Sequence, residues 1–280
     1  MVHLNNDLGL SDGENIDGYI NDALGSGELI EASAGTYETE LGWDGWTDGD
    51  HSDEDAEDDA QIDPNDGPIE GRINIFNCYL SGSTDNALYC DSDYADGGGM
   101  TVRNCVFHNH DVGYFRAGGG EDVLEDSLFI GDSNSDRGID GGSHDFVRIR
   151  EQSDYSGPGS LQMRNCEMIS DAEGGELFGF RNSGDSWSLD EYSGTIENVR
   201  VECNSGNDIV DVRGDIDLDG LTIRDLHITG DDPGDLDDGP NYENVVEGDD
   251  ANPVTWGIDE VLGRTLPDRQ PSGEPPQGEF

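Results

Sequence analysis

A phrase of alternating apolar and polar residues recurs six times along the chain, with an Asn or Asp at its centre. The six versions are spaced 22 to 39 residues apart and read IFNCYL, VRNCVF, LEDSLF, MRNCEM, IENVRV and IRDLHI. Alternation with period two indicates strands, because successive side chains of a strand point to opposite faces. A repeat of this length is typical of solenoids, in which each repeat packs on its neighbours.

A bend is expected at the centre of each phrase, because Asn and Asp tolerate the left-handed backbone that a sharp turn requires. In stacked repeats these side chains can hydrogen-bond along the stack, while the residue after each bend points inward, about 4.8 Å from its counterpart. The expected bends are Asn77, Asn104, Asp126, Asn165, Asn198 and Asp225. The expected inward stack is Cys78, Cys105, Ser127, Cys166, Val199 and Leu226.

The cysteines of this stack are expected to be buried and reduced. The chain has five Cys and no CxxC motif, which fits neither a disulfide framework nor a zinc site. Cys78 and Cys105 would be near neighbours, but stacked side chains are poorly aimed for a disulfide.

A second phrase follows each of the first five bends, so every repeat holds at least two short strands in a fixed order. These phrases are DNALYC (85–90), DVGYFR (111–116), DRGIDG (136–141), GELFGF (175–180) and NDIVDV (207–212). One coil of a parallel β-helix has this organisation, with loops of different length inserted at its corners. The path of residues 143–160 stays open, since FVRIRE is either a third strand or part of a long excursion.

The whole pattern resembles the right-handed parallel β-helix proteins of the pectate-lyase-like superfamily, over roughly residues 14–230. The resemblance, together with the right-handed preference of parallel crossovers, implies a right-handed coil. The predicted fold is therefore all-β: a right-handed parallel β-helix of about six to eight coils. An N-terminal α-helical cap and an extended C-terminal segment complete it.

Four regions are predicted along the chain. Residues 1–37 form the cap, residues 38–72 are an acidic insertion that leads into the first coil, and residues 73–230 form the coils. Residues 231–280 are a tail rich in Pro, Gly and acidic residues. An apolar island in the tail, VTWGIDEVLGRTL, is expected to dock on the chain's own coils, on a sister subunit or on another partner.

The charge of the chain narrows its partners. The sequence holds 65 acidic and 13 basic residues, for a net charge of −52, and every basic residue is Arg. Such a chain repels itself in dilute solution and is expected to need high salt. Its composition resembles that of haloarchaeal proteins. Nucleic acid is disfavoured as a partner, which leaves cations, sugars or another protein.

Location is the next property on which the sequence bears. No run approaches the roughly 18 apolar residues of a membrane helix, so no membrane insertion is expected. The N-terminus shows no signal-peptide pattern. We therefore expect a cytoplasmic protein, or one that leaves the cell by another route, such as virus release by lysis. In the second case it would lie on the virion surface or outside the cell, in high salt.

The residues just before the bends predict an outward column whose charge alternates after its first member. This column is Phe76, Arg103, Glu125, Arg164, Glu197 and Arg224. In adjacent coils it would form a ladder of Arg–Glu pairs, each contributing about a few tenths of a kcal/mol. The alternation avoids the stacking of like charges.

A second outward column is predicted from the second phrases, as Tyr89, Phe115, Asp140, Gly179 and Asp211, with Arg116, Arg181 and Arg213 just after it. Acids, aromatic residues and Arg suit a sugar-binding face, and a solvated halophilic surface is the alternative. The glycan-binding candidates are Tyr89, Phe115 and Trp187. If the protein is an enzyme, the candidate catalytic residues are Asp140, Asp211, Arg116 and Arg213.

The resemblance also implies where catalysis would occur, on the outer surface of one sheet. For lyases it implies a Lys or Arg base with calcium-bridged carboxylates, and for hydrolases paired Asp, a His and an RIK-like triplet. The sequence has no Lys. His144-Asp145 and Arg148-Ile149-Arg150 are similar to parts of the hydrolase set.

A metal site is weakly indicated by the segment DSNSDRG, which is similar to the opening of a calcium loop. The Glu that closes an EF-hand is missing, since Ser143 stands at that position. The metal candidates are Asp132, Asn134 and Asp136. No cofactor is expected to be required, and weak association of Mg²⁺, Ca²⁺, Na⁺ or K⁺ is expected.

Three functional hypotheses follow. The first is a non-enzymatic surface protein of a virus of a halophilic archaeon: a turret, spike or tail-associated β-helix. The resemblance implies a homotrimer that attaches to a host glycan, and the tail would contact other virion proteins. The second is an extracellular polysaccharide lyase or glycoside hydrolase of the same superfamily. The third is a structural protein of the host cell surface.

Overall fold

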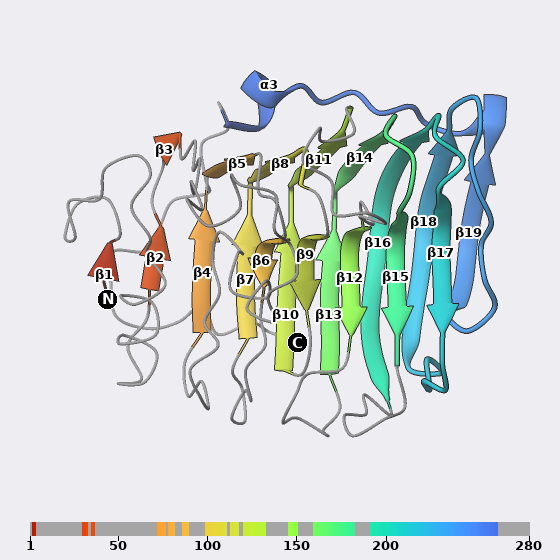
Figure 1. The fold of residues 1–280 in the computed structure, drawn as a ribbon, viewed down its shortest axis with the longest axis horizontal. Helices are drawn as coiled ribbons and strands as arrows, with labels where there is room; N and C mark the ends of the chain where they lie inside the picture. Colours follow the sequence, from red (N-terminus) through yellow and green to blue (C-terminus); the bar gives the residue numbers. More distant parts are fainter. Residues whose placement is uncertain are drawn as a thin grey trace, which may run out of the picture.

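The structure is a computed structural model whose described part is built almost entirely of parallel strands (Figure 1). It describes residues 2–3, 30–32, 35–36, 72–76, 78–81, 86–89, 99–110, 113–117, 120–132, 145–150, 159–182 and 191–262. The strands form a large sheet and a five-stranded sheet. The all-β class with parallel strands, expected from the sequence, is confirmed. The predicted N-terminal helix and acidic insertion lie outside the described residues.

The large sheet consists of two arms that meet at bends in the chain. The first arm is β1 (Val2–His3), β2 (Ile30–Ala32), β4 (Arg72–Phe76), β7 (Gly99–Arg103), β10 (Gly120–Glu125) and β13 (Gly159–Arg164). The second arm is β3 (Gly35–Thr36), β5 (Cys78–Ser81), β8 (Val106–His108), β11 (Leu128–Gly131) and β14 (Glu167–Ser170). The long strands β16 (Tyr192–Cys203) and β18 (Leu221–Thr229) continue both arms, and β19 (Asn241–Glu247) pairs with β18.

The five-stranded sheet takes one strand from each of five successive repeats. In spatial order it is β17 (Asp208–Arg213), β15 (Glu176–Arg181), β12 (Asp145–Arg150), β9 (Gly113–Ala117) and β6 (Asn86–Tyr89). The five repeats from β4 to β17 each contribute to the first arm, then the second arm, then this sheet, and neighbouring repeats pair in parallel. Residues far apart in sequence therefore form columns across neighbouring strands.

Left-handed residues mark the bends between the two arms. The φ angles lie between 52° and 56° at Asn104, Asp126, Asn165, Asn198 and Asp225. The amide of Asn198 donates to Asn165 over 2.8 Å, and that of Asn165 donates to Asp126 over 3.3 Å. The predicted bends and side-chain stack are thus confirmed here, while Asn77 lies outside the described residues.

The residue after each bend points into the core, as predicted. Cys105, Ser127, Cys166, Val199 and Leu226 are all fully buried. Cys105 and Cys166 are free thiols, and the Cys105 thiol lies 3.3 Å from the carbonyl oxygen of Arg103. The side chain of Cys78 is outside the description, but its strand β5 pairs with β8, which begins directly after Cys105.

Stacked aromatic rings fill the core between the second arm and the five-stranded sheet. The ring centroids of Phe107 and Phe129 lie 4.7 Å apart, and those of Tyr114 and Phe146 lie 4.6 Å apart. Each pair joins equivalent positions of neighbouring strands, which is the offset packing that aromatic side chains favour. The core therefore fixes the stacking of the sheet that carries the candidate site.

The stacking continues beyond residue 230, the predicted end of the coils. Strand β19 holds Asn244 in the left-handed region, with φ of 55°, and its amide donates to Asp225. The sequence YENVV around Asn244 has the form of the recurring phrase. The apolar island after β19 contacts the chain's own strands through Trp256 and α3 (Ile258–Leu262). Within the described part of the chain, no helix has the length and apolarity to span a membrane.

Candidate functional site

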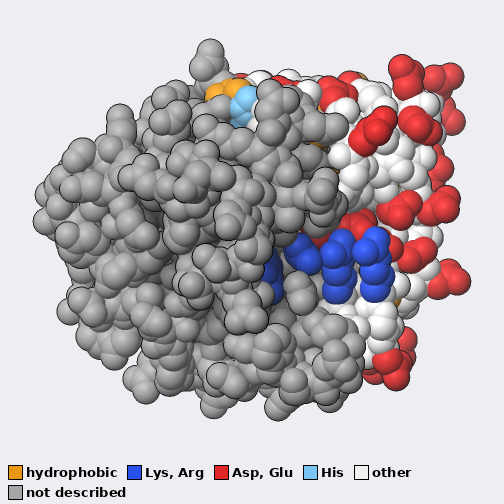
Figure 2. Space-filling model, in the orientation of Figure 1, with side chains coloured by type: hydrophobic (Ala, Val, Ile, Leu, Met, Phe, Trp, Pro, Cys, Tyr) orange, Lys and Arg blue, Asp and Glu red, His pale blue; other side chains and the backbone are white. Residues whose placement is uncertain are grey.

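Five of the 13 basic residues lie on the five-stranded sheet, and three pairs of them are direct neighbours in register. Arg116 pairs with Arg148, Arg150 pairs with Arg181, and Arg181 pairs with Arg213. Figure 2 shows basic side chains gathered in one row on this face, with acidic side chains around them. We call these five residues the arginine row; Arg150 belongs to it by strand register alone, since its side chain lies outside the description.

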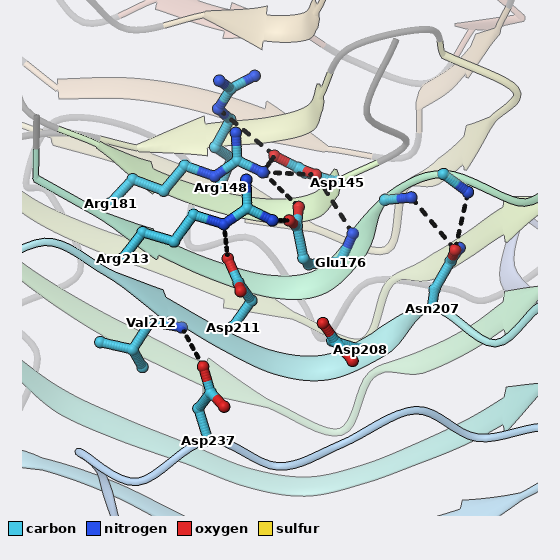
Figure 3. A network of polar contacts seen from close by, with 12 residues as sticks. Asp145, Arg148, Glu176, Arg181, Asn207, Asp208, Asp211, Val212, Arg213 and Asp237 are labelled. Atoms are coloured by element: carbon cyan, nitrogen blue, oxygen red, sulfur yellow. Dashed lines mark hydrogen bonds and ion pairs between the residues drawn. The ribbon is translucent and has the colours of Figure 1, made fainter. Parts of the chain in front are cut away.

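Like charges in register on neighbouring strands repel, so the arginine row requires compensation. Three carboxylates of the same sheet supply it: Asp145 in β12, Glu176 in β15 and Asp211 in β17. Figure 3 shows Arg181 and Arg213 side by side, with their guanidinium groups turned toward Glu176. The site therefore consists of arginine side chains paired with three carboxyl groups of the same sheet.

Glu176 is the shared partner of two neighbouring arginines. One carboxylate oxygen accepts a hydrogen bond from Arg181 Nη2, and the other accepts one from Arg213 Nη2. Arg213 also contacts Asp211, with 2.7 Å between Nε and Oδ2. Only 5% of the Glu176 side chain is exposed, against 57% of that of Arg213. The carboxylate thus anchors the row from below, and Arg213 remains open to solvent.

Asp145 is the deepest acid of the site and is fully buried. Its Oδ1 accepts the backbone N–H of Glu176 over 3.3 Å. Its Oδ2 lies 3.1 Å from Arg181 Nη2 and 3.4 Å from Arg148 Nε. The same guanidinium group of Arg181 therefore bridges Asp145 and Glu176, which holds the two carboxyl groups together.

The environment separates the pKa values of these carboxyl groups. Burial, and then a hydrogen bond to Glu176, raise the pKa of Asp145 well above its ordinary value, which Arg148 and Arg181 only partly offset. Burial also raises the pKa of Glu176, but the hydrogen bond from Asp145 and the charges of Arg181 and Arg213 outweigh it, so this pKa is lowered. The shifts favour the protonated form at Asp145 and the ionised form at Glu176.

Asp211 forms the third acid at the exposed end of the site. Burial and the charge of Glu176 raise its pKa, while Arg213 and Arg181 oppose the rise. Between Asp211 and Arg148 the column is bare, because Gly179 occupies the intervening position. A Cβ at Gly179 would lie 3.7 Å from Arg181 Nε and 3.8 Å from Glu176 Oε2. Gly179 therefore lies in a buried position beside Arg181 and Glu176 and contributes no side chain to the column.

The structure brings together some predicted site residues and corrects others. Arg116, Asp211 and Arg213 lie in the site, as expected for one outward face. Phe115 was predicted to point outward and bind glycan, but it is fully buried in the core. The reason is register: Gly113 pairs with Asn86, which places Arg116 beside Tyr89 and turns Phe115 inward.

The segment predicted to form the middle strand of the five-stranded sheet is also wrong. The segment DRGIDG was expected there, but β12 comes from the later segment DFVRIR, whose Phe, Val and Ile favour a buried strand. Arg148 therefore fills the position predicted for Asp140. Asp140 and Trp187 lie outside the described residues, as does the side chain of Tyr89.

Of the two central acids, Asp145 was noted only for its similarity to part of the hydrolase set and was not a candidate site residue, and Glu176 was missed. Each begins its strand just before apolar core residues, so in sequence it looks like an ordinary strand-start acid. A signal existed in the repeated pattern of an acid followed by apolar residues and then Arg, in DFVRIR and ELFGFR. Only the parallel register shows that the two acids meet.

The metal prediction remains open. Asp132 accepts a hydrogen bond from the amide of Asn109 over 2.8 Å, and its other oxygen lies 2.9 Å from His108 Nε2. Asn134 and Asp136 lie outside the described residues. Among the residues that are described, no three His, Cys, Asp or Glu side chains are grouped as metal ligands.

The predicted alternating ladder lies on the first arm of the large sheet. We call Arg103, Glu125, Arg164, Glu197 and Arg224 the Arg–Glu ladder; they occupy one register column. Glu125 contacts both Arg103, at 2.6 Å, and Arg164, while Arg224 contacts Glu197. This prediction is confirmed, and it gives a second arginine set with which to compare the arginine row.

Searches of protein families, curated proteins and solved structures return no match for this chain. The geometry of the strands and of the site therefore indicates the class of the protein. That geometry defines an all-β protein of stacked parallel strands with an arginine–carboxylate site on the outer face of one sheet.

Proposed function

We propose that the chain is a right-handed parallel β-helix protein that binds an acidic glycan through the accessible end of its arginine row, at Arg181 and Arg213. The observation that carries the proposal is the set of three in-register Arg–Arg neighbours in a chain of net charge −52. Stacked like charges reduce stability, and Arg is scarce in this sequence. A ligand that supplies negative charge to the row accounts for the presence of these neighbouring arginines.

The chemistry of arginine suits such a ligand. The guanidinium group presents its donors as a planar fork that matches a carboxylate or sulfate group. In molar salt, attraction between exposed charges is screened beyond about 3 Å, so recognition must come from direct hydrogen bonds. Glu176 and Asp145 hold Arg181 in place before the ligand arrives, which reduces the ordering cost of binding.

The wider setting that we propose is attachment. A rigid face of stacked strands with a fixed cationic row suits a protein on a virus particle of a halophilic archaeon, bound to host glycans. The acidic composition supports a high-salt environment. A homotrimer with an N-terminal cap, and contact with other virion proteins through the C-terminal tail, belong to the same proposal. A structural protein of the host cell surface would share the fold without the glycan.

Polysaccharide cleavage is a second candidate function. It is favoured by one observation, the neighbouring acids Asp145 and Glu176 with pKa values moved in opposite directions. Their direct contact argues against a glycosidase, whose two carboxyl groups stand about 5 to 9.5 Å apart. Asp145 is also fully buried, so it cannot reach a sugar without movement of Arg181.

Binding to defined polysaccharides in molar salt tests the proposal. The probes are a polyuronate, a sulfated polysaccharide and a neutral glucan of similar length. We expect the acidic polymers to bind and the neutral one not to bind. Arg213→Gln should weaken binding about tenfold, the scale of one lost charged hydrogen bond. Arg164→Gln is the matched control on the Arg–Glu ladder and should bind as the wild type does.

Two results would overturn this proposal. The first is equal binding of the neutral and acidic polymers, and the second is equal loss in Arg213→Gln and Arg164→Gln. The same incubations separate binding from cleavage. New reducing or unsaturated ends that disappear in Glu176→Gln would favour the enzyme instead.

A further inference from the structure

The end of the described chain crosses the outer face of the large sheet. After β19, residues 251–262 run back over the strands built before them, as Figure 1 shows. The backbone N–H of Asn252 donates to His227 in β18 over 3.1 Å, and Trp256 reaches Glu167 in β14. Helix α3 reaches β8. We call residues 251–262 the strap.

Glu167 is the polar anchor of the strap. It is nearly fully buried, and its Oε2 accepts the backbone N–H groups of Thr255, over 2.6 Å, and Trp256, over 2.7 Å. The Thr255 hydroxyl donates to Oε1 over 3.0 Å, and Arg200 donates to the same oxygen over 3.0 Å. Two consecutive backbone donors on one carboxylate form strong, charge-assisted hydrogen bonds that recognise an extended chain.

An apolar patch beside Glu167 receives the far end of the strap. Val261 is fully buried and clusters with Val106, Leu128 and Ile130. Trp256, Ile258 and Ile169 pack at the margin of this cluster. The strap groove is thus Val106, Leu128, Ile130, Glu167, Ile169 and Arg200. Without the strap, its aliphatic side chains would form an apolar patch on an outward face, which soluble proteins rarely leave open.

The connection that leads to the strap is exposed. The short helix η2 (Gly248–Asp250) has no buried residue and no side-chain cap. A Cβ at Gly248 would meet nothing within 4 Å, and Pro253 is exposed. The strap is therefore held at His227, Glu167 and Val261, and the segment that joins it to β19 is exposed. Such a connection can carry the strap to a different site without disturbing the core.

We infer that the strap groove also takes the strap of a second copy of this chain, so that the protein associates by exchange of residues 251–262. The groove already fits this sequence, and exchange between copies reproduces every contact without a new interface. Repulsion between two chains of net charge −52 is screened in high salt. Glycan binding is not involved, because the arginine row lies on the other sheet.

Exchange between two tagged forms of the full chain tests this inference. The two forms are mixed at high concentration in molar salt, incubated warm, diluted, and captured through one tag. We expect the second tag to copurify in the wild type. The double variant Val106→Cys with Val261→Cys joins the strap to its own groove when oxidised before mixing. We expect copurification to be lost in the oxidised variant and restored after reduction.

A kinetic variant supplies an independent measurement. Glu167→Gln keeps the shape of the anchor and removes its charge, so the strap should open more readily. We expect exchange to be about tenfold faster than in the wild type. The inference is overturned if the wild type shows no copurification, or if the oxidised double variant copurifies as the wild type does. It is equally overturned if Glu167→Gln leaves the exchange rate unchanged.

Discussion

The two arginine sets of this protein differ in how neighbouring strands arrange their charges. In the Arg–Glu ladder the sign alternates along the register column, so each Glu lies between two Arg. In the arginine row, Arg stands beside Arg in three register pairs. The charge of the row is compensated by Asp145 and Glu176, which belong to the same sheet and contact Arg181.

Arg164 of the Arg–Glu ladder and Arg213 of the arginine row can be compared directly. Arg164 is 53% exposed and contacts Glu125, which is 8% exposed and also holds Arg103. Arg213 is 57% exposed and contacts Glu176, which is 5% exposed and also holds Arg181. The exposure of the two arginines and of their shared glutamates is thus nearly equal, although Arg213 also contacts Asp211. The difference lies in the neighbours, since repulsion is avoided in the ladder and accepted in the row, which points to a role beyond stability.

The largest expected effect is the loss of Glu176. Glu176→Ala would leave Arg181 and Arg213 adjacent without their shared carboxylate, and would remove the hydrogen-bond partner of Asp145. We expect a loss of about 3–5 kcal/mol in the free energy of unfolding, as for other broken buried pairs. Urea denaturation at constant molar salt measures it.

Glu125→Ala is the matched change in the Arg–Glu ladder. Arg164 keeps Glu197 as its register neighbour, and the ladder arginines are more exposed than Arg181. We expect a loss of about 1 kcal/mol, with the exposed partners screened by salt. Equal losses in the two variants would show that the arrangement of neighbours has no energetic consequence, and the comparison would fail.

The next effect is a pH dependence that belongs to the arginine row. Because the pKa of Asp145 is raised in the folded protein, the folded state keeps a proton that the unfolded chain releases above about pH 3.9. Stability should therefore fall as pH rises from about 4 toward the raised pKa, by about 1.4 kcal/mol per pH unit. Unfolding free energies measured at steps from pH 4 to pH 7 follow this decrease.

Asp145→Asn should remove the decrease, because the amide cannot release a proton. Glu176 acts in another window: its pKa is lowered, so its contribution is present above about pH 4.3 and is lost only as pH falls. Glu125→Gln controls for the loss of one acid from the other arginine set. Parallel pH profiles for the wild type and Asp145→Asn would contradict the assignment of the proton.

Prediction from sequence was accurate where one residue type marks a local geometry. Asn and Asp tolerate the left-handed backbone, so their recurrence located the bends at Asn104 and Asn165. The residue after each bend was then predicted to point inward. The charges just before the bends then gave the Arg–Glu ladder, since strand alternation left no choice of face. Asn244 was missed because the phrase around it stands among acids, Gly and Pro.

The five-stranded sheet has no such marker, and prediction was weaker there. Without a bend residue to fix the register, a one-residue shift in β9 turned Phe115 from the core to the surface. Whether DRGIDG or DFVRIR forms the strand of this sheet depends on packing against neighbouring repeats, which cannot be predicted from a local sequence pattern. The meeting of Asp145 with Glu176 follows from that register alone, so the centre of the site appeared only in the structure.

The smallest expected effect separates the two exposed arginines by stability. Arg164→Gln removes a pair with Glu125, and because the side chain is half exposed we expect a loss below about 1 kcal/mol. Arg213→Gln removes the contacts with Glu176 and Asp211, but it relieves repulsion from Arg181, its register neighbour, so we expect the net change to lie within about 0.5 kcal/mol of zero. Urea denaturation of both variants at several salt concentrations resolves the two, since added salt should narrow the difference. If Arg213→Gln loses more stability than Arg164→Gln, then Arg213 is held for the fold. If it loses none while acidic polymers bind more weakly, its contribution belongs to the ligand.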